Sequence, residues 1–154
     1  LVLPEVNMQT YHPQSPLPQT LSIGEKLGVV VHSSQDVPRA LSQGLPLKSL
    51  TFLAEQLAVS QLEMLRLTDI SEASLRRRRK TGHFLPQESE RIYRYAEVFQ
   101  AALELFEDEV AARDWLKRPR GYFQDTAPLE VARSEYGARR VLLFIAQLEA
   151  GTYV

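Results

Sequence analysis

Four arginines and a lysine follow one another in the sequence segment SLRRRRKTG. Clustered Lys and Arg side chains are the groups that bind nucleic-acid phosphates. At about 100° of rotation per helical residue, Arg76, Arg79 and Lys80 share one side of a helix. Arg77 and Arg78 lie on other sides, so we expect two or three phosphate contacts. The alternative is a solvated helix end, whose positive charge suits the helix dipole.

Residues near the start of a recognition helix usually read bases, and later basic residues hold phosphate. Here the start of the helix offers Glu72, Ala73 and Ser74 or Arg76. The expected DNA-binding residues are Ser74, Arg76, Arg77, Arg79 and Lys80.

Catalytic and metal chemistry find little support elsewhere in the chain. The 154 residues contain no cysteine, and the three histidines have no metal-ligand spacing. There is no Gly-rich phosphate loop and no motif for a nucleophile and its base. We therefore expect no enzyme, no cofactor and no metal. The formal net charge of -1 leaves nucleic-acid binding to a local patch.

The basic segment occupies the second helix of an expected helix-turn-helix unit. Ser60 and Glu63 have the spacing of a capping box, which predicts a short helix starting there. The residues TDIS supply a tight connection, and Ser71 can cap the basic helix, whose one strongly apolar residue is Leu75. This layout is the plan in which the last helix enters a major groove.

Helix start and stop signals along the whole chain predict an all-α fold. Residues 1–20 are rich in proline and form an expected disordered arm, followed by a helix-turn-helix domain at 21–86 and a helical domain at 87–154. No segment is long and apolar enough for a membrane span of roughly 18 residues, and we expect a cytoplasmic protein. Helices are predicted over residues 22–30, 36–43, 47–57, 61–67, 72–80, 87–107, 109–117, 128–135 and 138–150.

Several spaced motifs between Leu21 and Gly151 resemble one known family. They are GLP at 44–46, ISEASLRRRRKTG, LPQESERIYRYAEVFQAALELF, AARDWL and PLEVARSEYGARRVLLFIAQLEAG. Together they are similar to the Xre-like antitoxins of bacterial Xre-RES type II toxin-antitoxin systems, which have an Xre/MbcA/ParS-like toxin-binding domain at the C-terminus.

The resemblance implies a homodimer that binds and neutralises a cognate RES-domain toxin, an enzyme that degrades NAD. It also implies repression of the chain's own operon through operator DNA. The tail after the last helix is short and anionic, which suits insertion into the toxin's substrate cleft. A frayed terminus is the competing interpretation. The expected toxin-binding residues are Tyr122, Arg139, Arg140, Leu148, Glu149, Gly151, Thr152, Tyr153 and Val154.

Other conspicuous residues have structural interpretations. Trp115 and Leu116 are expected in the core. The charges of Glu88, Glu90, Arg91 and Arg94 are expected to pair along a solvent-facing helix, where Arg91 is also a candidate to border the DNA surface. The segment KRPRGYF, at 117–123, is either a contact for toxin or nucleic acid or a connection whose two aromatics tuck against the core.

The alternative function is a stand-alone helix-turn-helix transcriptional regulator that uses the same basic helix. The C-terminal third discriminates between the two, because a simple regulator does not need its Trp-Leu, Pro-Leu and Gly-Ala-x-x-Val series.

Overall fold

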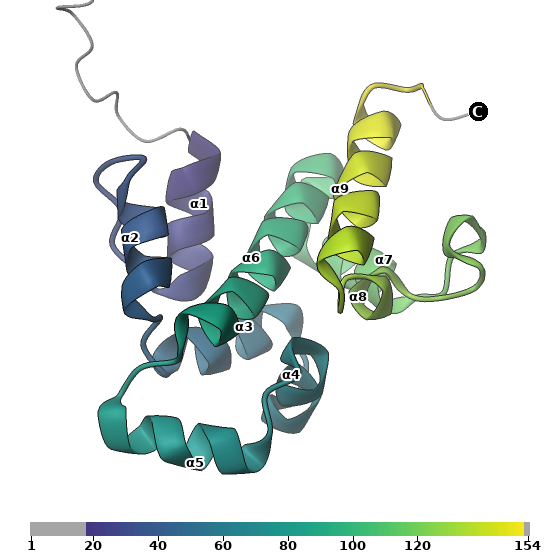
Figure 1. The fold of residues 1–154 in the computed structure, drawn as a ribbon. Helices are drawn as coiled ribbons and strands as arrows, with labels where there is room; N and C mark the ends of the chain where they lie inside the picture. The colour runs from purple at the N-terminus through teal and green to yellow at the C-terminus, as the bar shows by residue number, and fades with distance from the viewer. Residues whose placement is uncertain (1–17, 153–154) are drawn as a thin grey trace, which may run out of the picture.

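The computed structural model describes residues 18–152 and confirms the all-helical fold (Figure 1). Within that range the backbone forms no β-strand, only the isolated bridges Pro46–His83 and Arg120–Thr126. None of the helices in this part of the chain has the length and hydropathy needed to cross a bilayer. The helices are α1 (Pro18–Leu27), α2 (Asp36–Gln43), α3 (Lys48–Leu57), α4 (Gln61–Thr68), α5 (Glu72–Thr81), α6 (Pro86–Phe106), α7 (Glu109–Lys117), the 3-10 turn η2 (Gly121–Phe123), α8 (Pro128–Val131) and α9 (Glu135–Glu149).

The boundaries of three helices differ from the sequence prediction by three or four residues. The first helix begins at Pro18, inside the range we assigned to the arm, and ends before Gly28, whose φ of 65° stops it. The predicted helix 128–135 is only the short α8, because Ser134 is already the cap of the next helix. Its Oγ accepts a hydrogen bond from the Gly137 N–H at 2.9 Å, so α9 starts at residue 135 rather than 138. Residues 1–17 of the expected arm lie outside the described residues.

The long helix α6 is the centre of the fold. It packs against α1, α2 and α3 at one end and against α7 and α9 at the other (Figure 1). The apolar face of α6 is buried at Ile92, Tyr95, Ala96, Phe99 and Ala102, whereas Leu103 and Phe106 are half-buried. One continuous apolar cluster runs from α1 to α9 along this helix.

Polar side chains of α6 tie the two ends of the fold together. Arg91 donates from Nε to the Thr68 carbonyl at 2.6 Å and from Nη2 to the Asp69 carbonyl at 3.3 Å. Arg94 donates to the Arg133 carbonyl at 3.0 Å. The expectation that Arg91 and Arg94 pair with acids along their own helix is therefore wrong, because backbone carbonyls of other elements are within their reach.

The buried Tyr95 hydroxyl lies between the Leu67 carbonyl at 3.2 Å and the Leu129 carbonyl at 2.9 Å. It thus joins the end of α4 to α8. On the surface above it, Arg66 pairs with both Glu63 and Glu130. Burial raises the pKa of Tyr95, so the hydroxyl stays neutral and remains a donor.

Gly137 is required by the close approach of α8 to the first turn of α9. A Cβ at this position would lie 1.8 Å from the Val131 carbonyl oxygen. We expect Gly137→Ala to lower the free energy of unfolding by about 1–3 kcal/mol, because backbone would have to shift. Urea unfolding measures this effect. Gly121→Ala is the control, since a Cβ at Gly121 meets open space; equal stability of both variants would contradict the prediction.

Candidate functional site

Helices α4 and α5 form the helix-turn-helix unit. Ser60 Oγ accepts the Glu63 N–H at 3.0 Å, and Ser71 Oγ accepts the Ser74 N–H at 3.0 Å, so both predicted caps are present. The Glu63 carboxylate does not complete a capping box. It binds Arg66 Nη2 at 2.7 Å instead, since this arginine lies one turn along on the same face.

Asp69 ends α4 in the left-handed region, with φ of 54°, and the chain reaches Ser71 two residues later. This short turn is the segment that Arg91 holds through the Thr68 and Asp69 carbonyls. The single buried residue of α5, Leu75, anchors the helix to the core. Helix α5 therefore lies at the edge of the fold (Figure 1), and most of its side chains are exposed.

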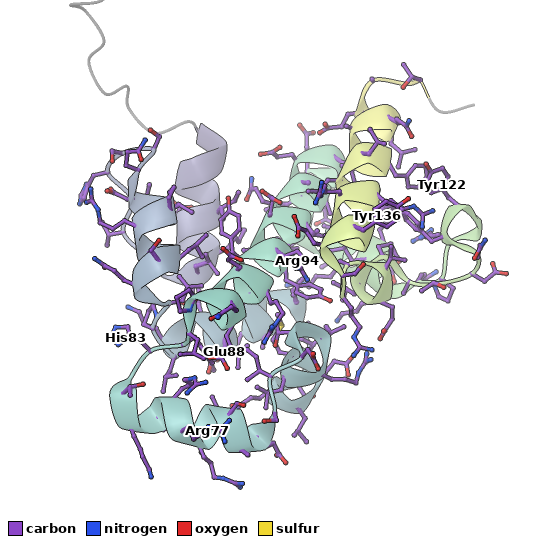
Figure 2. The ribbon with its side chains drawn as sticks, viewed as in Figure 1. Arg77, His83, Glu88, Arg94, Tyr122 and Tyr136 are labelled. Atoms are coloured by element: carbon purple, nitrogen blue, oxygen red, sulfur yellow. The ribbon has the colours of Figure 1, made fainter. Side chains whose placement is uncertain are left out.

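The five consecutive cations of α5 separate into two groups. Arg76, Arg79 and Lys80 are exposed and make no hydrogen bond or ion pair to any described residue. Arg77 is exposed as well, and its Nη2 donates to Ser74 Oγ at 3.1 Å (Figure 2). Arg78 is different, since its Nε donates to Glu88 Oε1 at 2.7 Å in a largely buried ion pair. Four of the five cations are thus exposed, and Arg78 has a structural role.

Glu88 joins the end of α5 to the start of α6. Its Oε1 accepts the Leu85 N–H at 2.8 Å as well as Arg78 Nε, so one carboxylate caps α6 and pairs with α5. Burial alone would raise the pKa of Glu88. The hydrogen bonds from Arg78 and Leu85 outweigh burial and hold the pKa below its ordinary value. The expectation that Glu88 lies on a solvent-facing side of its helix is therefore wrong. Glu88 is buried, because Arg78 supplies its counter-charge.

Replacing Glu88 by Gln should lower the free energy of unfolding at pH 7 by about 1–3 kcal/mol, since Arg78 loses its charged partner. The folded-state pKa is below the ordinary 4.5, so the ionised carboxylate stabilises the fold above pH 4.5. This contribution is lost as the pH falls through the folded-state pKa. Urea unfolding at pH 7 and in the acid range measures the difference between the two proteins.

The control for Glu88→Gln is Glu90→Gln, which removes the same charge from an exposed position on the same helix. We expect this control to change stability by less than about 0.5 kcal/mol. A Glu88→Gln protein as stable as the control at pH 7 would contradict the assignment.

At the other end of the molecule, aromatic rings from four elements form one cluster. Trp115 lies 5.8 Å from Phe106 and 6.1 Å from Phe144 between ring centroids. Phe144 also stacks in parallel on Tyr122 at 4.0 Å and meets Phe123 edge-on at 5.5 Å. The expectation that Trp115 and Leu116 are core residues is confirmed, as both are buried.

The segment 117–123 combines the two interpretations left open by its sequence. Phe123 is buried against the core, whereas Tyr122 lies over Phe144 with part of its ring exposed. Arg120 covers Trp115 at 5.5 Å and donates to the Trp115 carbonyl, and Arg140 covers Phe123 at 5.5 Å. Both arginines thus fix aromatic rings while their charge remains at the surface.

Helix α9 carries an exposed apolar face. Tyr136 is 74% exposed and Leu143 is 57% exposed, and with Arg140 they follow one another at four- and three-residue steps. Figure 2 places Tyr136 and Tyr122 at the α9 end of the molecule, away from Arg77 on α5. We call Tyr122, Tyr136, Arg140 and Leu143 the α9 patch. Sequence reasoning missed Tyr136 and Leu143, although Leu143 lies off the buried stripe of Val141 and Ile145.

The remaining predicted toxin-binding residues lie along α9 and its end. Arg139 is exposed and pairs with Glu135 at 2.7 Å. Leu148 is half-buried, Glu149 is exposed, and Gly151 has the expected left-handed φ of 64°. Thr152 closes the helix, since its N–H donates to the Gln147 carbonyl at 3.1 Å. Tyr153 and Val154 lie outside the described residues. In the described part of the chain no group of His, Asp or Glu has the arrangement of a metal site.

The fold and these two surfaces define a class of protein: a helix-turn-helix protein with an additional helical domain at the C-terminus. Residues 36–97 match the family model described as the antitoxin Xre-like helix-turn-helix domain. Residues 101–151 match that of the antitoxin Xre/MbcA/ParS C-terminal toxin-binding domain. The chain belongs to the Xre antitoxin family, as its sequence motifs predicted.

Two relatives are similar to the chain over most of its length. A protein named antitoxin Xre from Yersinia enterocolitica is 30% identical over 148 residues, which cover 95% of this chain and 99% of the relative. A protein of the same name from Photorhabdus laumondii is 28% identical over 135 residues, which cover 86% of this chain and 91% of the relative. Both similarities extend across the helix-turn-helix unit and the C-terminal domain together.

Proposed function

We propose that this chain is the antitoxin of a type II toxin-antitoxin pair and acts by binding rather than by catalysis. The observation that carries the proposal is the C-terminal domain match at residues 101–151, because this domain presents the exposed α9 patch. Its exposed tyrosines and Arg140 are of the residue types that are enriched in binding hot spots. The toxin would cover the α9 patch and the end of α9.

The toxin is a RES-domain enzyme that degrades NAD, and the C-terminal segment blocks its active site. The family resemblance supports the identity of the toxin. The geometry supports the blocking mode, because α9 ends at an exposed Gly151 and Thr152 that contribute nothing to the core. The following residue Tyr153 provides an aromatic ring that an NAD pocket can accept.

The helix-turn-helix unit represses the operon of the pair. Helix α5 would enter the major groove, with Ser74 and Arg76 near the bases and Arg77, Arg79 and Lys80 on phosphates. We propose a homodimer, because two such helices read the two half-sites of a symmetric operator. The pair acts in the cytoplasm, where both NAD and operator DNA are found.

The gene beside this chain's own gene tests the proposal, because we expect it to encode a RES-domain protein. The two proteins are then co-expressed. We expect the chain to restore growth and the cellular NAD level and to co-purify with that protein. A chain that binds operator DNA but neither co-purifies nor restores NAD would instead be a stand-alone regulator. The two readouts therefore separate the two functions.

A further inference from the structure

A second candidate binding site lies on another face of α9. A groove of about 240 Å³ opens between α1, α6 and α9. Its polar wall is a stripe of α6, and its apolar wall and far end come from α9. We call it the acidic groove, defined by Glu97, Gln100, Glu104, Leu142, Ile145 and Glu149.

The acidic groove contains hydrogen-bond acceptors that lack donors. Gln100 is only 8% exposed, its Nε2 donates to Glu104 Oε1 at 3.0 Å, and its Oε1 has no hydrogen-bond partner. Glu97 is half-buried and makes no hydrogen bond or ion pair to a described residue. Burial accordingly raises the pKa of Glu97. A buried acceptor without a donor costs about 1–3 kcal/mol, so this site favours a ligand that donates hydrogen bonds.

The lining selects the chemistry of that ligand. No lysine or arginine lines the groove, while three carboxylates do. The lining therefore favours a ligand that carries a positive charge. A metal ion is not favoured, since the described residues hold no cluster that could bind one. Leu142 and Ile145 offer an apolar wall beside the carboxylates, which fits the aliphatic stem of a lysine or arginine whose charged head reaches the acids.

The chain itself is an unfavourable source of this positively charged side chain. Residues 1–17 contain no lysine or arginine, so this segment cannot supply the charge. A second copy that paired the same groove with itself would bring carboxylates against carboxylates, which is unfavourable. The remaining source is another protein.

We propose that the acidic groove receives a lysine or arginine side chain of the toxin. The inference rests on the proposed antitoxin function. Glu149 connects the two sites, since it lines the groove and lies two residues before Gly151, where the predicted toxin-binding tail begins. A toxin that holds the tail is therefore within reach of the groove. The groove gives it a negatively charged contact, whereas the charge of the α9 patch is the positive one of Arg140.

The test measures binding of the purified full-length chain to the RES-domain protein encoded beside its gene, by titration calorimetry. We expect the double variant Glu97→Gln with Glu104→Gln to raise Kd about ten- to hundredfold, because a desolvated ion pair is lost. The salt dependence of binding should also become shallower. The control is Glu55→Gln with Glu107→Gln, which removes two charges at exposed positions and should leave Kd unchanged.

Gln100→Leu separates a binding role from a structural one. It removes the unpartnered carbonyl at similar volume, so the fold should be at least as stable in urea unfolding while the toxin binds several-fold more weakly. Unchanged Kd in both the Gln100→Leu and the Glu97/Glu104 variants would overturn the proposal.

A third variant, Tyr136→Ala with Leu143→Ala, reports on the proposed function independently. If it loses toxin binding while the groove variants bind normally, the antitoxin function stands and the groove proposal fails. If the unmodified chain does not bind the toxin, both fail. A groove variant that changes the mass of the free chain in light scattering would reassign the groove to contacts between copies.

Discussion

Removal of Thr152 to Val154 should abolish neutralisation of the toxin while the antitoxin remains folded. The expected loss of affinity is at least about thirtyfold, since a central anchor in an interface contributes about 2 kcal/mol or more. The fold should survive because the hydrophobic core ends within α9, and the Gly151 N–H already closes the helix on the Leu148 carbonyl at 3.2 Å. Growth rescue and the NAD level measure neutralisation, and thermal unfolding measures the fold.

A matched control for this deletion is Val110→Ala. Val110 is an exposed apolar residue on α7, outside both the α9 patch and the acidic groove. This variant should neutralise the toxin as the unmodified chain does. Full neutralisation by the truncated chain would refute the inserted-tail mechanism and leave the α9 patch as the site of inhibition.

Replacing Arg76, Arg79 and Lys80 together by alanine should weaken operator binding about a hundredfold or more at physiological salt. Each lost phosphate contact lowers the slope of log K against log salt by roughly 0.9, so two or three contacts should lower it by about 2–3. The fold should be unaffected, because these three side chains make no contacts that hold the helix-turn-helix unit together. Fluorescence anisotropy at several salt concentrations measures both quantities.

The reciprocal control carries Arg118, Arg139 and Arg140 as alanines. It removes the same charge at the opposite end of the molecule and should retain operator binding. The α5 variant, in turn, should still neutralise the toxin. Operator binding by the α5 variant with unchanged affinity and salt slope would exclude α5 as the groove-entering helix.

Local signals in the sequence predicted most of the helices. Ser60 and Ser71 cap their helices because a serine hydroxyl needs only an amide three residues away. Gly151 ends α9 for an equally local reason, since its φ of 64° suits a residue without a side chain. The spacing of the residues from Arg76 to Lys80 likewise predicted which cations share a face of the helix and which lie on other sides.

Contacts between distant residues could not be predicted in the same way. Glu88 and Arg91 look like members of a solvent-facing charge pattern, yet Glu88 pairs with Arg78 and Arg91 binds the turn after α4. Their partners lie 10 and 23 residues away along the chain, and only the packing of α5 and α4 against α6 brings them together. Tyr136 and Leu143 were missed because their exposure depends on which face of α9 meets α6 and α7.

The aromatic cluster around Trp115 has a thermodynamic consequence for recognition. The rings of Phe106, Trp115, Phe123 and Phe144 are already packed in the free chain, and Arg120 and Arg140 already cover two of them. The surface that carries Tyr122 and Tyr136 is therefore preorganised, and association need not order a disordered segment of this domain. Among the described residues, the loss of conformational entropy on binding should be confined to a few surface side chains.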